Sequence, residues 1–275
     1  DYYSAGPDES FLRRPLPRLP ATDRWTTVAG MNRSLLPLAT ALLHATTAAP
    51  ASEAGTLPAL PRTAMSVDHP ATGFHAGTGN EHESRPALSL IKLYLADYVL
   101  SHGDPADAEK ARHMVRTSDD ATASELQARY PGAIRHTADY YGLRATTETP
   151  HWGNSTTSTA DVTAFPLAKQ RQNPQDPVLV EMTQAAPVTA DGYPQDFGTA
   201  TLPGVTGTKF GWSDDRTSIH ASASIGPDLV VSAHTWGTAA EHTKDVQAAL
   251  PADPVRQAQD AFNENVAALR ALLPD

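Results

Sequence analysis

The stretch that decides the fold is Pro86–Leu100, which reads PALSLIKLYLADYVL. Its apolar residues recur at helical spacing, at Leu88, Ile91, Leu95 and Val99. This spacing predicts a mostly buried helix. Ser89 and Lys92 lie three residues apart in the same stretch. Because residues at this separation share one helix face, the pattern places a hydroxyl one turn away from an amine.

This Ser-x-x-Lys spacing is a candidate for nucleophilic catalysis. A serine hydroxyl is a poor nucleophile until a base removes its proton. The Lys92 amine can be that base if burial in the apolar helix lowers its pKa. A serine at a helix start also directs its own backbone N–H toward a developing oxyanion. The alternative is that Ser89 and Lys92 share this spacing by chance.

Composition limits the possible classes of protein. The chain has 275 residues, of which 40% are hydrophobic and 19% are charged, and these values are typical of a globular protein. It has no cysteine, which excludes disulfides, a cysteine nucleophile and thiolate metal ligands. The net charge of -10 disfavours a nucleic-acid partner. The 11 histidines show no metal-binding spacing, so we expect no metal and no cofactor.

The sequence predicts no integral membrane segment. The longest apolar stretch, Leu35–Ala49, is interrupted by Pro37 and His44 and is too short and too polar to span a bilayer. The chain begins at Asp1 instead of Met, so we expect a processed protein whose export signal is not shown. Its Ala- and Thr-rich, cysteine-free composition is compatible with an exported protein of a high-GC bacterium.

Patterns of polarity predict an interrupted fold. Strands are expected at Thr63–Val67, Gly73–Ala76, Thr217–Ile225 and Leu229–Thr235, the last two forming a hairpin. Helices are expected over Ser34–Leu43, Ala106–Arg116, Ala121–Tyr130, Ile134–Tyr141 and Pro254–Leu273, and from Ser155 onward. We therefore expect an extended arm over 1–30, an α/β lobe with an antiparallel sheet over 31–93 and 166–275, and an inserted all-helical lobe over 94–165.

Two further motifs follow Ser89 along the chain. Ser118-Asp119-Asp120 lies between two predicted helices, where a helix N-cap is the alternative interpretation. The segment Gly204–Gly211 reads GVTGTKFG. It is not a phosphate-binding loop, because Lys209 is followed by Phe210 instead of Ser or Thr. We expect Lys209 to lie on a strand and to point at the site that contains Ser89; a flexible turn that enters an edge strand is the alternative.

The three motifs SLIK (89–92), SDD (118–120) and KFG (209–211), with their flanks, resemble those of the penicillin-recognising serine hydrolases. This superfamily includes class A β-lactamases, D-alanyl-D-alanine carboxypeptidases and low-mass penicillin-binding proteins. The resemblance covers roughly residues 60–273. It implies an α/β (α+β) β-lactamase/transpeptidase-like fold, in which an antiparallel sheet is flanked by helices next to an all-helical lobe.

The resemblance also implies residue roles. Ser89 would be acylated, Lys92 would accept its proton, Ser118 would relay a proton to the leaving nitrogen, and Lys209 would attract the substrate carboxylate. The backbone N–H groups of Ser89 and Trp212 would form the oxyanion hole. The residues expected to line the substrate site are Asp120, Phe210, Gly211 and Trp212.

Two positions depart from the family pattern. Asp120 stands where the family has Asn. An ionised aspartate cannot donate a hydrogen bond, and it repels a carboxylate-bearing ligand unless it pairs with Lys92 or Lys209. Phe210 stands where the family has a Thr or Ser hydroxyl that binds the substrate carboxylate. In addition, Glu148 lacks the spacing of the glutamate that deacylates class A β-lactamases, which argues against efficient β-lactamase activity.

The sequence therefore predicts a serine acyl-enzyme hydrolase or peptidase that acts outside the cytoplasm, at the cell envelope. Its expected partner is a D-Ala-D-Ala-like peptidoglycan peptide, a β-lactam-like small molecule or a related amide. One alternative is a catalytically impaired or dead family member that serves as an envelope binding or structural protein. A second alternative is a β-lactamase. The sequence leaves the oligomeric state open.

Overall fold

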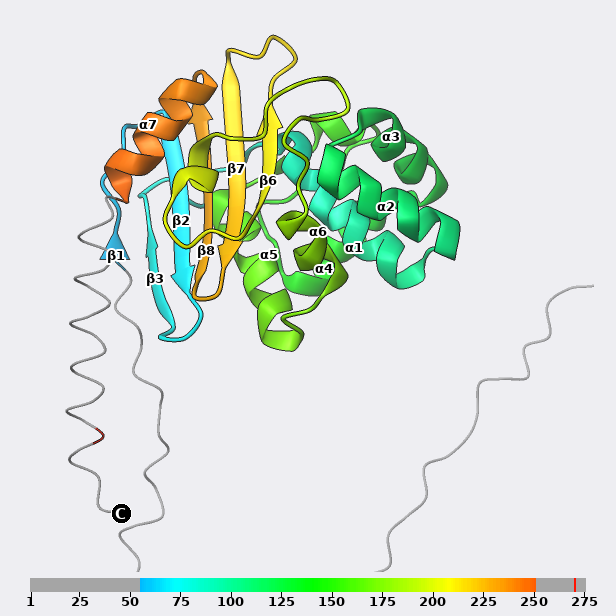
Figure 1. Ribbon diagram of the computed structural model, residues 1–275, viewed down its shortest axis with the longest axis horizontal. Coiled ribbons are helices and arrows are strands. Elements are labelled where there is room, and N and C mark those ends of the chain that lie inside the picture. Colours follow the sequence, from blue (N-terminus) through cyan, green and yellow to red (C-terminus); the bar gives the residue numbers. More distant parts are fainter. Residues whose placement is uncertain (1–54, 251–269, 271–275) are drawn as a thin grey trace, which may run out of the picture. The chain divides into compact units, whose positions relative to one another are not determined.

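The computed structural model describes residues 55–250 and Arg270. Its main element is a mixed six-stranded sheet with the strand order β1-β3-β2-β8-β7-β6 (Figure 1). The strands are β1 (Gly55–Thr56), β2 (Thr63–His69), β3 (Phe74–Gly77), β6 (Gly207–Trp212), β7 (Ile219–Gly226) and β8 (Leu229–Trp236). A two-stranded ribbon joins β4 (Arg85–Pro86) to β5 (Thr156–Thr157).

Helices cover both faces of the sheet. In Figure 1, α7 lies against one side of the sheet, and α1 to α6 lie on the other side. The helices are α1 (Lys92–His102), α2 (Pro105–Thr117), α3 (Asp120–Arg129), α4 (Ala133–Tyr141), α5 (Thr159–Gln172), α6 (Pro177–Thr183) and α7 (Ala239–Ala249). Three short 3-10 helices are η1 (Leu88–Ile91), η2 (Trp152–Asn154) and η3 (Gly198–Thr201). Among the described residues, no helix is long and apolar enough to cross a bilayer.

This architecture confirms the predicted fold class, with one correction. The sheet is mixed and not purely antiparallel, because the two-residue strand β1 pairs in parallel with β3. The β7–β8 hairpin turns after Gly226, as predicted. The helix expected from Ser155 begins later, because residues 156 and 157 form β5 and the Ser158 side chain caps α5 by accepting from the Asp161 N–H.

The domain boundaries expected from the sequence stay predictions. The expected arm over 1–30 and the helix over Ser34–Leu43 lie outside the described residues. The helix expected over Pro254–Leu273 falls outside them too, apart from Arg270.

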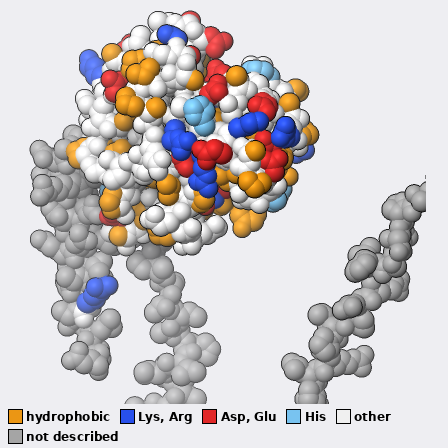
Figure 2. Space-filling model, turned by 45° about the vertical axis from the view of Figure 1, so that its right-hand side comes forward, with side chains coloured by type: hydrophobic (Ala, Val, Ile, Leu, Met, Phe, Trp, Pro, Cys, Tyr) orange, Lys and Arg blue, Asp and Glu red, His pale blue; other side chains and the backbone are white. Residues whose placement is uncertain are grey.

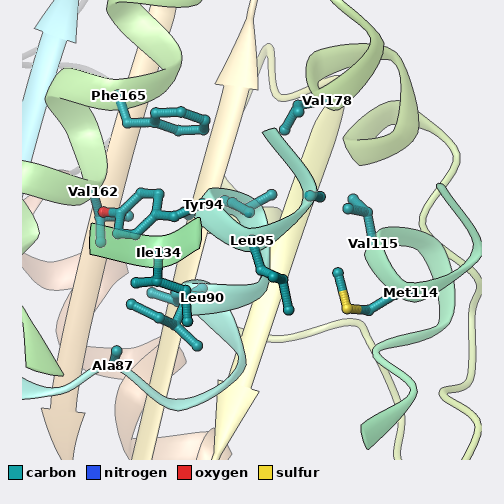
Figure 3. Close-up of a cluster of buried hydrophobic side chains, with 14 of the residues drawn as sticks. Ala87, Leu90, Tyr94, Leu95, Met114, Val115, Ile134, Val162, Phe165 and Val178 are labelled. Atoms are coloured by element: carbon teal, nitrogen blue, oxygen red, sulfur yellow. The ribbon is translucent and has the colours of Figure 1, made fainter. Parts of the chain in front are cut away.

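A buried cluster fixes α1 in the middle of the helices. Tyr94 packs edge-on against Phe165 of α5, with ring centroids 5.1 Å apart. Figure 3 shows Leu90, Tyr94 and Leu95 among side chains from α2, α4, α5 and α6. Packing at this density tolerates little displacement, so the start of α1 and the preceding η1 are held in place by the interior of the protein.

Ion pairs balance the charge on the outer helices. Arg116 of α2 binds Glu181 of α6 at 2.8 Å, and Arg129 of α3 binds Asp107 of α2 at 2.8 Å. Figure 2 shows Lys and Arg side chains interspersed with Asp and Glu on the side of the molecule that carries α2 and α3. This face therefore presents alternating charges and not a patch of one sign.

The strand register corrects the placement of Phe210. On β6, Lys209 pairs with Ala223 and Phe210 pairs with Ser222, so their side chains point to opposite faces of the sheet. The Phe210 ring packs at 5.0 Å from the Phe197 ring and is 2% exposed. The side chain expected in the substrate site therefore belongs to the core on the α7 side.

We predict that Phe210→Thr lowers the free energy of unfolding by about 3 kcal/mol, because it empties a packed aromatic site and buries a hydroxyl. Urea denaturation followed by circular dichroism measures this loss. The control Leu60→Thr alters a residue that is 55% exposed, and we expect a change of less than about 0.5 kcal/mol. Equal stabilities of Phe210→Thr and the unaltered protein would contradict the assigned packing.

Candidate active site

A pocket of about 340 Å³ opens where η1, α3, η2 and the end of β6 meet. Its lining residues are Leu88, Ser89, Asp120, Trp152, Gly153, Asp191, Trp212, Ser213, Asp214 and Arg216. Three of the residues predicted for the site, Ser89, Asp120 and Trp212, are therefore brought together in one pocket.

Ser89 lies in a constrained turn at the pocket wall. The preceding residue, Leu88, has a φ of 53°, a left-handed conformation that is costly for a residue with a branched side chain. Ser89 itself is only 8% exposed, yet its Oγ makes no hydrogen bond to any residue in 55–250. A nearly buried hydroxyl without a protein partner is therefore presented to the pocket.

Gly211 allows β6 to approach this turn closely. A Cβ atom at position 211 would lie 2.8 Å from the Leu88 Cβ and 3.1 Å from the Ser89 backbone nitrogen. Both distances are shorter than ordinary van der Waals contact. The bare glycine therefore lets the backbone of β6 lie directly beside the backbone N–H of Ser89.

Lys92 lies beneath the pocket and is paired. Its side chain is 0% exposed, and its Nζ donates to the Ser118 carbonyl at 2.6 Å and forms an ion pair with the Asp120 carboxylate. The same amine stands 4.4 Å from the centroid of the Trp152 ring. Burial lowers the pKa of Lys92, and the Asp120 charge opposes this effect. No hydrogen bond joins Lys92 to Ser89 Oγ in the described structure.

Ser118 links the two lysines. Its Oγ accepts a hydrogen bond from Lys209 Nζ at 2.7 Å and lies 3.5 Å from Lys92 Nζ. The helix cap expected in this motif is supplied by Asp119, which accepts from the Ala121 N–H, whereas Ser118 ends α2 with a left-handed φ of 58°. That conformation turns the Ser118 hydroxyl toward both amines.

Lys209 is completely buried on the helical face of β6. Burial, followed by repulsion from Lys92, holds the pKa of Lys209 well below its usual range. The predicted set thus lies in two layers: Ser89, Asp120 and Trp212 line the pocket, and Lys92, Ser118 and Lys209 lie beneath it. Gly211 lies at the junction of β6 and η1, and Phe210 lies outside the site.

The sequence interpretation missed a charged rim of the pocket, which is formed by Asp191, Asp214 and Arg216. Asp191 accepts from Arg216 at 3.1 Å, and the Arg216 guanidinium lies 5.3 Å from the Tyr193 ring centroid. The Tyr193 ring in turn stacks on Trp212 at 4.6 Å. Asp191, Asp214 and Arg216 lie in loops and carry no motif, so no local pattern in the sequence marks them.

Trp152 also lines the pocket. Its backbone N–H donates to Gln127 at 2.6 Å, and its indole N–H donates to Ser124 at 3.1 Å. Both partners belong to α3, so the ring is held rigidly over Lys92. Trp152 is 7% exposed, and it both packs against the core and lines the pocket.

Glu148 is a structural residue and not part of this pocket. Its carboxylate accepts from the backbone N–H groups of Gly132 and Arg135 at the start of α4, at 3.2 and 3.1 Å. It lines a neighbouring hollow that contains Arg135 and His151. Glu148 is therefore not among the residues that line the pocket containing Ser89.

The site offers no evident place for a metal. Within the residues that the structure describes, no three His, Asp or Glu side chains are grouped so that they could hold an ion.

Comparisons with known proteins give structural relatives only. No family model matches the chain, and no curated protein matches it in sequence. Penicillin-binding protein D2 from Listeria monocytogenes, in a cefotaxime-bound form, superposes with a TM-score of 0.52 at 19% identity, over 68% of this chain and 94% of that one. The β-lactamase from Streptomyces albus G gives 0.53 at 16% identity, over 69% and 92%. The D-alanyl-D-alanine carboxypeptidase from Mycobacterium tuberculosis H37Rv gives 0.52 at 17% identity, over 72% and 92%.

These relatives share one architecture, and identities below 20% establish the fold but not the activity. The chain has the fold of the penicillin-recognising serine hydrolases.

Proposed function

We propose that this protein is a serine acyl-transferring hydrolase or peptidase of the penicillin-binding type, with Ser89 as the nucleophile. The observation that carries the proposal is the unpartnered, 8% exposed Ser89 hydroxyl above two buried lysine amines that share the Ser118 hydroxyl. A buried amine with a lowered pKa can take up a proton near neutral pH. A hydroxyl, a neighbouring amine and backbone N–H groups are the groups that support acyl transfer.

The proposed reaction has two steps. Ser89 Oγ attacks the substrate carbonyl carbon, and its proton passes to the neutral Lys92 amine. The backbone N–H groups of Ser89 and Trp212 stabilise the oxyanion. The proton then moves through Ser118 to the leaving nitrogen or oxygen, whose bond to the carbonyl carbon breaks. Water hydrolyses the resulting ester and restores Ser89.

The Lys92–Asp120 ion pair opposes the first step. The Asp120 carboxylate stabilises the protonated form of Lys92, and a protonated amine cannot accept a proton. This pair supports the second candidate function, a catalytically impaired member of the fold that binds its ligand without turnover. The absence of Glu148 from the pocket makes a β-lactamase the weaker alternative.

We place the protein outside the cytoplasm, at the cell envelope, and propose a peptidoglycan peptide or a related amide as its substrate. The proposal rests on the shared fold and on the motifs that surround Ser89.

The first prediction concerns covalent labelling. Incubation with a fluorescent penicillin and, separately, with a neutral phenylacetyl aryl ester should give an acyl adduct on the peptide that contains Ser89. Intact mass and peptide mapping measure it. We expect Ser89→Ala to lose the adduct with both probes. Ser101→Ala, which alters an exposed serine on α1, should keep it.

An adduct that survives Ser89→Ala would contradict the assigned nucleophile. If neither probe labels Ser89 in the unaltered protein, the hydrolase proposal fails, and the binding protein becomes the supported function.

The second prediction concerns pH. The acylation rate rises with pH as Lys92 loses its proton, and Asp120 raises the pKa of that amine. Asp120→Asn should therefore lower the pKa of Lys92 and move the rising limb of the rate profile to lower pH. If the pKa of Lys92 falls by one unit, acylation becomes about tenfold faster at pH values where Lys92 is mostly protonated.

Rates of Ser89 acylation by the neutral ester between pH 5 and 10, a range that lies below the ordinary lysine value of about 10.4, measure this shift. The control Asp196→Asn removes an exposed carboxylate that does not line the pocket, and its profile should match that of the unaltered protein. If the rising part of the rate profile stays in place or moves to higher pH in Asp120→Asn, Lys92 is not the base.

A further inference from the structure

The pocket above Ser89 carries an uneven set of charges. Its lining includes three carboxylates, from Asp120, Asp191 and Asp214, and one guanidinium, from Arg216. Asp191 pairs with Arg216, and Asp120 pairs with Lys92 from below. The Asp214 side chain is exposed and has no hydrogen-bond or ion-pair partner within residues 55–250.

The positive groups of the pocket are already engaged. Arg216 binds both the carboxylate and the carbonyl of Asp191, at 3.1 and 3.3 Å, and also lies over the Tyr193 ring. The amine of Lys209 is buried and donates to Ser118. In the described part of the lining, therefore, the charge of the guanidinium is offset by Asp191, and the Asp214 carboxylate is left without a counter-charge.

The Ser213 hydroxyl and the side chain at position 210 also provide no binding group for a carboxylate. Ser213 lines the pocket, but its hydroxyl donates to Asp215 at 2.6 Å. The Phe210 side chain points to the other face of the sheet. Ser89 itself is the reacting group. An anionic group in this pocket would displace water and lie near the unpaired Asp214 carboxylate, and the charge of the lining guanidinium is already offset by Asp191.

The walls of the pocket suit a cation. The indoles of Trp152 and Trp212 both line it, and tryptophan faces are the best aromatic partners for ammonium groups. Trp152 already holds the Lys92 ammonium at 4.4 Å from its ring centroid, which shows the interaction within the same site. Trp212 is partly exposed, and its ring stacks on the Tyr193 ring with the centroids 4.6 Å apart.

We propose that the pocket takes an acyl donor that carries an ammonium group, and that it disfavours one with a carboxylate beside the reacting carbonyl. The recognising groups are the free Asp214 carboxylate and the Trp212 ring, and the nearly buried, unpartnered Ser89 hydroxyl marks where the acyl group lies. This inference rests on the proposed function, because it names the substrate class of the same site.

Three p-nitrophenyl esters of matched shape test the preference. Their acyl chains end in a trimethylammonium group, a tert-butyl group or a carboxylate. Release of p-nitrophenolate and intact mass, corrected with Ser89→Ala, give the rate of Ser89 acylation. We expect the ammonium ester to react about fivefold faster than the tert-butyl ester, the size expected for one unit charge at a partly solvated site. The carboxylate ester should react slowest.

Asp214→Asn should bring the ammonium and tert-butyl esters to nearly equal rates, because it removes the unpaired charge. The matched control Asp139→Asn alters an exposed aspartate on α4 that does not line the pocket, and it should keep the preference. Equal rates for all three esters in the unaltered protein, or a fastest reaction with the carboxylate ester, would overturn the inference.

A binding measurement separates this inference from the proposed function. If no ester acylates Ser89, the hydrolase proposal fails, and the charge preference is then decided by NMR titration of Ser89→Ala with benzyltrimethylammonium and with benzoate. Tighter binding of benzyltrimethylammonium, lost in the double variant that also carries Asp214→Asn, supports the inference. Equal binding or tighter binding of benzoate overturns it.

Discussion

The burial of two lysine amines at one point constrains the rest of this structure. Lys92 and Lys209 are both 0% exposed, and both reach the Ser118 hydroxyl. Removing an ammonium group from water costs several kcal/mol unless it is paired or neutral. The protein provides one carboxylate, from Asp120, for two amines. Burial lowers the pKa of Lys92, and burial followed by repulsion from Lys92 holds the pKa of Lys209 well below its usual range.

The scaffold keeps these amines together through backbone features. The left-handed turn at Ser118 ends α2 and aims its hydroxyl at both lysines. Gly211 lets β6 lie against the turn at Leu88 and Ser89. The packed side chains around Tyr94 hold α1, and with it Lys92, in a fixed position. Rigid support of this kind is what a preorganised site requires.

Much of this arrangement could be predicted from the sequence. Apolar periodicity located α1, and the ordered motifs at Ser89, Ser118 and Lys209 pointed to residues that do meet in the structure. These signals are local, because helical spacing and short motifs are read within a few residues. The possibility that Asp120 pairs with Lys92 also followed from charge alone.

The remaining features depend on distant parts of the chain. The face on which Phe210 lies is set by the register between β6 and β7, and a shift of one residue would reverse it. The rim formed by Asp191, Asp214 and Arg216 comes from loops that the sheet and helices bring together. The link between Asp191 and Arg216 spans 25 positions in the chain, so no local pattern could reveal it.

The central claim is that burial makes the Lys92 and Lys209 amines unusually acidic, and an NMR titration of lysine side chains tests it most directly. The chain has only five lysines, at 92, 110, 169, 209 and 244, so the ¹³Cε signals can be assigned with Lys92→Met and Lys209→Met. We expect these two signals to titrate below the ordinary lysine value of 10.5, with Lys209 the lower. Titration of both amines at or above that value would contradict the account.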